Sequence, residues 1–187
     1  MLHPDTRREF RTPEIGDGVV ATRLIPRGTV IWVRDPLDLS ITKQTFRLFP
    51  PSVREQIDKY TFYGEDDLMI LCWDLARYTN HSCDPNSLTI RTDFTIAIRD
   101  IHPGEEFAED YALLNLHEDQ TFDCHCGAAQ CRKRVGPHDV ATQSDKWRDA
   151  ISGAMALMDQ VRQPLKFLLR AECLDRARAY CATVAAS

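Results

Sequence analysis

The chain has 187 residues, of which 43% are hydrophobic and 27% are charged, and its formal net charge is −5. This composition excludes a disordered tail, a collagen-like repeat and a low-complexity linker, and the acidic balance argues against a general nucleic-acid binder. No apolar run approaches the ~18 residues that span a bilayer. The polar start, MLHPDTRREFRT, lacks the apolar centre of a secretory signal. We therefore expect an intracellular protein, cytoplasmic or, in a eukaryote, nuclear, with no membrane partner.

The first hundred residues have the pattern of short strands separated by turns. Segments rich in β-branched residues and bounded by glycine or proline turns predict strands over residues 19–25, 29–33, 68–73, 87–92 and 94–100. The last two flank a tight turn near Asp93, and their apolar and polar residues alternate. Residues 52–58 fit a short helix.

The end of the chain has a different pattern. From Ser144 onward the apolar residues recur at helical spacing, at Trp147, Ile151, Met155, Met158 and Val161, and after Pro164 at Leu165, Leu169, Cys173, Ala177 and Cys181. Ser144 is a suitable N-cap, and Pro164 suits the first turn of a helix. We expect two helices whose apolar stripe packs against the strand domain.

The seven cysteines exclude a fully paired disulfide framework, because their number is odd. Cys124, Cys126 and Cys131 lie within eight residues, CHCGAAQC, and three thiolates so spaced can fold around one ion. Tetrahedral zinc needs a fourth ligand. Cys83, in the polar turn NHSCDPN, is a better candidate than His125, whose ring lies between two ligands. An ion held by four sulfurs has no open position and is structural; the alternative is three crowded free thiols.

Charge is unevenly distributed near this cluster. Seven acids and no Lys or Arg lie between Glu105 and Asp123, and a short basic cluster, Arg132 to Arg134, follows. An acidic segment beside reactive chemistry suits a cationic substrate, because it raises the local concentration of that substrate. The alternative interpretation is a solvated acidic face.

Four motifs in order give the chain a family resemblance. GDGVVATRLIPRGTVI opens the series, RYTNHSCDPN and GEEFAEDY follow, and CHCGAAQC ends it. Together they resemble the SET-domain family of protein lysine methyltransferases followed by a post-SET segment, over residues 14–134. The resemblance implies a mostly β protein with α additions: a SET fold of small curved β-sheets with a pseudoknot-like core, a post-SET zinc site and a helical C-terminal tail. The expected divisions are residues 10–118, 119–136 and 137–187.

The resemblance also implies an activity and a set of site residues. The activity is S-adenosylmethionine-dependent N-methylation of a lysine in a basic protein segment, histone-like or other, with no direct nucleic-acid binding. Tyr111 matches the catalytic tyrosine of the family. The residues implied to contact the cofactor are Gly16, Asp17, Gly18, Val19, Tyr60, Arg77, Tyr78, Asn80, His81, Tyr111 and Phe122. Those implied to bind structural Zn²⁺ are Cys83, Cys124, Cys126 and Cys131.

One position departs from the family pattern. Two residues before the tyrosine, many members carry Phe or Tyr, whose side chain influences how many methyl groups are added, whereas this chain has Glu109. We hypothesise that Glu109 lies near the substrate channel and attracts the lysine cation before deprotonation; otherwise it is a surface residue.

Alternative functions stay open at this point. One is a catalytically silent SET-like module that binds a basic peptide or partner, although Asn80, His81 and Tyr111 are all present. Another is a zinc-stapled nucleic-acid binder that uses Arg132 to Arg134, for which three basic residues form a weak electrostatic footprint. The helical tail can pack on the core, shape the substrate groove or form a dimer.

Overall fold

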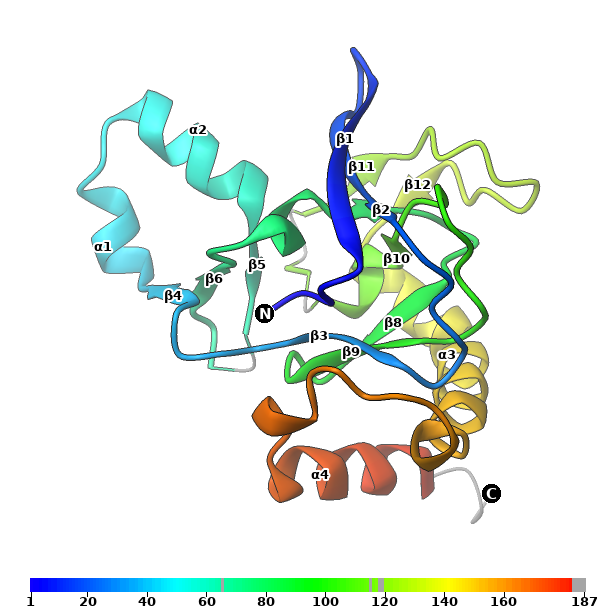
Figure 1. Ribbon diagram of the computed structural model, residues 1–187. Helices are drawn as coiled ribbons and strands as arrows, with labels where there is room; N and C mark the ends of the chain where they lie inside the picture. Colours follow the sequence, from blue (N-terminus) through cyan, green and yellow to red (C-terminus); the bar gives the residue numbers. More distant parts are fainter. Residues whose placement is uncertain (65, 115, 118–119, 183–187) are drawn as a thin grey trace.

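The computed structural model describes residues 1–64, 66–114, 116–117 and 120–182. Within these residues the strands are short and form five small sheets (Figure 1). Two sheets have three strands, in the orders β3-β9-β8 and β4-β6-β5, and three are pairs, β1-β2, β7-β10 and β11-β12. The strand bounds are β1 (Thr6–Thr12), β2 (Gly16–Ala21), β3 (Val30–Val33), β4 (Leu39–Ile41), β5 (Thr61–Tyr63), β6 (Met69–Leu71), β7 (Asn80–His81), β8 (Ser87–Ile90), β9 (Phe94–Ala97), β10 (Ala108–Glu109), β11 (Phe122–Asp123) and β12 (Arg134–Val135).

The helices lie at two ends of the molecule. Figure 1 shows α1 and α2 beside the β4-β6-β5 sheet, and α3 and α4 beside the β3-β9-β8 sheet. The α-helices are α1 (Lys43–Arg47), α2 (Pro51–Tyr60), α3 (Val140–Met155) and α4 (Ala171–Ala182). Short 3-10 turns are η1 (Leu75–Tyr78), η2 (Tyr111–Leu113), η3 (Pro137–Asp139), η4 (Met158–Gln160) and η5 (Lys166–Leu168). In the part of the chain that the structure describes, no helix has the length and apolarity that crossing a membrane requires.

The predicted fold class, small β-sheets with helical additions, is confirmed. Every residue of β3, β8 and β9 is buried, so both faces of this sheet are covered. One face belongs to a core cluster that contains buried residues of the helical tail, among them Trp147, Ile151, Leu165 and Cys173. The tail therefore packs on the strand core, as its apolar stripe predicts.

The predicted division of the chain into three parts, with boundaries between residues 118 and 119 and between residues 136 and 137, stays a prediction. Residues 118 and 119, which flank the first boundary and are two of the seven acids noted above, lie outside the described residues.

The bounds of the tail helices differ from the prediction. Helix α3 starts at Val140, not after an N-cap at Ser144. The Asp139 carboxylate accepts a hydrogen bond from the backbone N–H of Gly136 and starts the turn that leads into the helix. Pro164 does not open a continuous helix either. The Gln163 side chain instead forms hydrogen bonds with the backbone of Val30, Gly28 and Met158, which holds this segment next to β3. Helix α4 begins only at Ala171.

Strand β1 was not expected. Residues 1–12 lie outside the motifs, yet Thr6–Thr12 pairs with β2 in antiparallel register. The glycine turn thereby becomes one end of a hairpin, in which Gly16 has a φ of +85° that favours glycine.

Two of the motif segments lie side by side in the fold. Strands β7 and β10 pair in parallel, so that Asn80 lies opposite Ala108 and His81 opposite Glu109. The next residues continue this contact, because the backbone N–H of Ala108 donates to the Asn86 side chain at 3.0 Å. Residues 80–86 and 104–111 therefore lie side by side.

Candidate active site and metal centre

A mostly apolar cavity of about 120 Å³ opens beside Tyr111. Its wall includes Tyr60, Arg77 and Tyr111, three of the residues singled out in the sequence. The remaining wall residues are largely aromatic, aliphatic or hydroxyl-bearing: Trp32, Lys59, Thr61, Phe62, Tyr63, Cys72, Ala76, Thr79, Thr89, Thr95, Glu109, Leu114, Leu116 and Gln120. Such a cavity can hold the apolar stem of a long side chain.

The hydroxyl of Tyr111 has a fixed direction. It donates a hydrogen bond to the carbonyl oxygen of Thr79 at 2.6 Å. Burial is the main cause that raises the pKa of Tyr111, and the nearby Glu109 and Glu106 carboxylates raise the pKa further. The side chain is therefore a neutral phenol whose oxygen lone pairs remain available as acceptors toward the cavity.

Glu109 lies in the cavity wall and not on an outer surface. Its Oε2 accepts a hydrogen bond from the Thr89 hydroxyl at 2.7 Å, and the Thr89 and Thr95 hydroxyl oxygens are 2.7 Å apart. Burial raises the pKa of Glu109, against the two threonine hydrogen bonds, which lower it. The location agrees with the hypothesis that Glu109 lies near a channel, while its role stays a prediction.

Two other acids of this segment are held in ion pairs, whereas Asp123 is exposed. Glu105 pairs with Arg99, and Glu106 pairs with Arg11. Among the described acids of the segment, Glu109 is therefore the one in the cavity wall, and a solvated position applies to Asp123.

One side chain, that of Asn80, links the polar turn of residues 80–86 to strand β2. Asn80 Nδ2 donates to the backbone carbonyl of Asp17 at 3.0 Å and to Glu106 Oε1 at 2.7 Å. A Cβ on Gly18 would lie 2.3 Å from that same oxygen, so any other residue would displace the Glu106 carboxylate from Asn80. Val19 continues the strand and is fully buried. Gly16, Asp17, Gly18 and Asn80 thus lie together, as their shared assignment to a cofactor site requires.

The remaining cofactor candidates fall into two aromatic groups. Tyr60 and Tyr78 pack edge to face with ring centroids 5.5 Å apart, and the Arg77 side chain bonds the backbone of residues 73 and 74 nearby. Phe122 packs edge to face on His81 at 5.4 Å. Each aromatic group therefore contacts a residue in β7 or just before it, Tyr60 through Tyr78 and Phe122 through His81, while the role of these residues in holding a cofactor stays a prediction.

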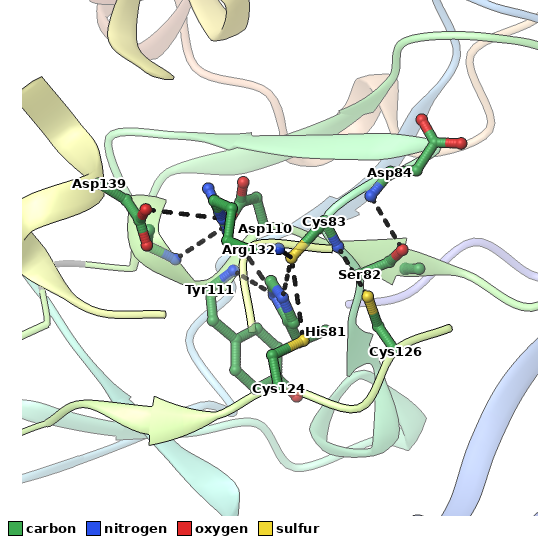
Figure 2. Close-up of polar contacts among 12 residues, drawn as sticks. His81, Ser82, Cys83, Asp84, Asp110, Tyr111, Cys124, Cys126, Arg132 and Asp139 are labelled. Carbon is green, nitrogen blue, oxygen red and sulfur yellow. Dashed lines mark hydrogen bonds and ion pairs between the residues drawn. The ribbon is translucent and has the colours of Figure 1, made fainter. Parts of the chain in front are cut away.

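A cluster of sulfur atoms lies next to this pair (Figure 2). Ligand atoms of His81, Cys83, Cys124 and Cys126 all lie within 4.8 Å of one another. Four sulfurs at ~2.3 Å from a zinc ion are about 3.8 Å apart, and the Cys83–Cys124 sulfur separation is 3.8 Å. Backbone N–H groups of Cys83 and Arg132 point at sulfur atoms at 3.4 Å, which stabilises thiolates. The donor set fits zinc.

His81 is poorly suited as a ligand, despite its place in the cluster. Its Nδ1 accepts a hydrogen bond from the backbone N–H of Tyr111 at 3.2 Å. In a neutral imidazole the proton is then on Nε2, which lies 3.4 Å from Cys83 Sγ. An Nε2–H group donates to sulfur and cannot bind a metal. Cys131 is not one of the four residues of this cluster; its thiol donates to the backbone carbonyl of Cys124 at 3.5 Å, and its place as the fourth ligand stays a prediction.

Asp110 is a buried residue that the sequence did not single out, although it lies inside the motif GEEFAEDY. Its Oδ1 accepts from Arg132 Nη2 at 2.6 Å, and its Oδ2 accepts from Trp147 Nε1 at 3.1 Å. Arg132 also lies 3.6 Å from Asp139 (Figure 2). Asp110 thus joins the central strands, the cysteine segment and α3. Arg132 is held inside the protein by these pairs and does not serve an exposed basic patch.

Comparison with known families decides what this arrangement is. The profile described as SET domain matches residues 16–112, slightly more than half of the chain. The chain belongs to the SET-domain family. The matched residues include Gly16, Asn80, Tyr111 and Cys83, whereas the cysteine segment and the tail lie beyond the match.

Several curated proteins are similar to this chain of the SET-domain family. Histone-lysine N-methyltransferase Set2 of Drosophila melanogaster is 32% identical over 140 residues, which are 69% of this chain and 6% of that protein. Histone-lysine N-methyltransferase ASHH3 of Arabidopsis thaliana is 31% identical over 146 residues, 72% of this chain and 39% of that protein. The chain therefore spans less than half the length of either relative.

Among solved structures, a crystal structure of KRYPTONITE in complex with mCHG DNA and SAH is similar at a TM-score of 0.47 and 25% identity. The likeness covers 67% of this chain and 28% of that one.

Proposed function

We propose that the protein is an S-adenosylmethionine-dependent protein-lysine N-methyltransferase. The observation that carries the proposal is the cavity beside Tyr111, which has an apolar aromatic wall and lies next to the paired segments of a SET domain. The names of the relatives, two of them histone-lysine N-methyltransferases, support the same reaction and a basic protein as the substrate.

The cavity wall favours the nucleophilic form of a lysine. A lysine amine with an ordinary pKa of about 10.4 is mostly protonated at neutral pH. Transfer into a channel walled by Tyr60, Phe62 and Trp32 penalises the charged ammonium and favours the neutral amine. The channel also aligns the amine in one direction, and alignment supplies much of the acceleration in displacement reactions.

Tyr111 and Thr79 direct the reacting groups. The Tyr111 hydroxyl donates its hydrogen bond to the Thr79 carbonyl, so its oxygen can only accept from the amine or from polarised C–H groups. S-adenosylmethionine, when bound, supplies an electrophilic methyl group on a sulfonium. The residues proposed to hold it are Gly16 to Val19 and Asn80, whose amide already fixes the glycine strand against the turn.

Structural zinc completes the proposal. Cys83, Cys124, Cys126 and Cys131 would hold one Zn²⁺, and they come from two segments that are about forty residues apart in the sequence. The ion would therefore fix the cysteine segment, and with it Phe122, against the central strands.

Methyl transfer from tritiated S-adenosylmethionine to a panel of core histones and other basic proteins tests this function. We expect label on lysine with the wild type and at least a hundredfold lower rate with Tyr111→Phe, since loss of one positioned hydroxyl costs about 10²–10³ in rate. Zinc-loaded, folded protein that neither binds S-adenosylmethionine nor transfers label would instead support a silent binding module.

A further inference from the structure

We propose that Glu109 is the proton acceptor for the substrate lysine: its carboxylate hydrogen-bonds the ammonium in the cavity and takes its proton before methyl transfer. This inference rests on the proposed function and assigns it a catalytic base. Three observations carry it: the place of the carboxylate, its partners, and the charges around it.

The Glu109 side chain lies in the wall of the cavity beside Tyr111. Of the described residues that line this cavity, Glu109 is the one carboxylic acid. It lies two residues before Tyr111, and strand β10, which is held by β7, carries it. The base and the phenol therefore face the same small volume, which is where a lysine nitrogen would end.

The hydrogen-bond partners of Glu109 leave its carboxylate able to accept a further hydrogen bond. Thr89 donates to Oε2 at 2.7 Å, and Thr95 lies 2.7 Å beyond Thr89. A carboxylate has about four acceptor positions, and two hydroxyl groups occupy at most two of them. The threonines fix the direction of the side chain without neutralising it.

The charges around Glu109 favour a cationic guest. No Lys or Arg among the described residues forms an ion pair with its carboxylate, whereas Glu105, Glu106 and Asp110 are each paired with an arginine. Lys59 and Arg77 belong to the cavity wall, and the other titratable wall residues are Cys72, Tyr60, Tyr63 and Tyr111. Burial is the main cause that raises the pKa of both Cys72 and Tyr111, and the charge of Glu109 adds to it. Among the described residues of this wall, Glu109 is therefore the one carboxylate that a lysine ammonium would meet.

Proton transfer in this setting removes two buried charges at once. Burial raises the pKa of Glu109, and the same desolvation lowers the pKa of a lysine ammonium in the channel. An N–H bond of the ammonium breaks as an O–H bond forms on Glu109, and the nitrogen regains its lone pair. The nitrogen then forms a bond to the methyl carbon as the sulfur–carbon bond of the donor breaks and leaves its electron pair on sulfur. The product is a methylated ammonium, and Glu109 releases its proton to solvent.

The test compares the wild type with Glu109→Gln, which keeps the shape but cannot take a proton. Glu105→Gln is the matched control, because Glu105 lies in the same segment and pairs with Arg99 outside the cavity. The measurements are kcat against pH, KM for the panel protein that accepts label, and calorimetric affinity for S-adenosylmethionine.

We expect Glu109→Gln to lower kcat at neutral pH by about 10²–10⁴, the usual contribution of a general base, with affinity for S-adenosylmethionine within threefold of the wild type. The remaining rate should rise with pH toward the lysine pKa, so the gap to the wild type narrows in alkali. Glu105→Gln should follow the wild-type profile. A Glu109→Gln variant with wild-type kcat, or one that loses rate equally at every pH, overturns the inference while leaving the proposed function intact. A wild type that labels no lysine contradicts both.

Discussion

Asp110 connects the central strands to the cysteine segment through Arg132 and to α3 through Trp147, so its removal should lower the stability of the protein strongly. In Asp110→Ala the Arg132 guanidinium, whose side chain is 15% exposed, loses its 2.6 Å partner, and the buried Trp147 N–H loses its acceptor. Breaking a buried ion pair costs about 3–5 kcal/mol. An orphaned buried donor costs about 1–3 kcal/mol, and the two terms overlap because they share one carboxylate.

We therefore expect Asp110→Ala to lower the free energy of unfolding by about 4 kcal/mol, out of a total of roughly 5–15 kcal/mol. With a urea slope of about 2 kcal/mol/M, the midpoint should fall by about 2 M. Asp110→Asn keeps one carbonyl acceptor and should lose less. Zinc, measured with a chromogenic chelator, should also leave Asp110→Ala faster, because Arg132 follows a proposed ligand directly.

Asp175→Ala provides the matched control. Asp175 pairs with Arg178 on the surface of α4, where both side chains are more than half exposed, so its loss should cost less than about 1 kcal/mol. Tryptophan fluorescence follows unfolding of all three variants. If the urea midpoint of Asp110→Ala falls no more than that of Asp175→Ala, the contacts of Asp110 with Arg132 and Trp147 do not stabilise the fold as described.

Three further changes test separate parts of the structure. Gly18→Ala places a Cβ 2.3 Å from Glu106 Oε1; we expect at least tenfold weaker S-adenosylmethionine binding by calorimetry, and unchanged affinity would remove Gly18 from the cofactor site. Gly28→Ala puts a Cβ 2.9 Å from the Ala154 carbonyl at a φ of +89°, so the free energy of unfolding in urea should fall by about 1–3 kcal/mol; an unchanged midpoint would refute this close approach. Cys126→Ser should leave less than one zinc per chain by atomic emission, and full occupancy would exclude Cys126 as a ligand.

The sequence indicated which segments meet in two ways, through the family resemblance of its motifs and through the ligand count of its cysteines. The family resemblance of residues 80–86 and 104–111 implied a pseudoknot-like core in which they meet, and the structure pairs these segments as β7 and β10. The ligand count alone favoured Cys83 as the partner of the later cysteines, and its sulfur lies 3.8 Å from that of Cys124. The apolar stripe of the tail likewise predicted its packing on the core.

Contacts that depend on partners far along the chain could not be predicted. Strand β1 exists because β2 offers it an edge, and nothing in residues 6–12 signals this partner. In the sequence Asp110 is one acid among several, and its role depends on Arg132 and Trp147, which only the fold brings next to it. The alternation of residues 94–97 indicated one polar face, but Thr95 is buried on that face, in the cavity wall with Thr89.

The most direct test of the account is tandem mass spectrometry of core histones and other basic proteins incubated with deuteromethyl S-adenosylmethionine and the wild type or Tyr111→Phe. The account predicts a CD3 group on the side-chain nitrogen of lysine with the wild type and almost none with Tyr111→Phe. A CD3 group on another residue type, equal labelling by both proteins, or no labelling by a folded, zinc-loaded wild type would contradict it.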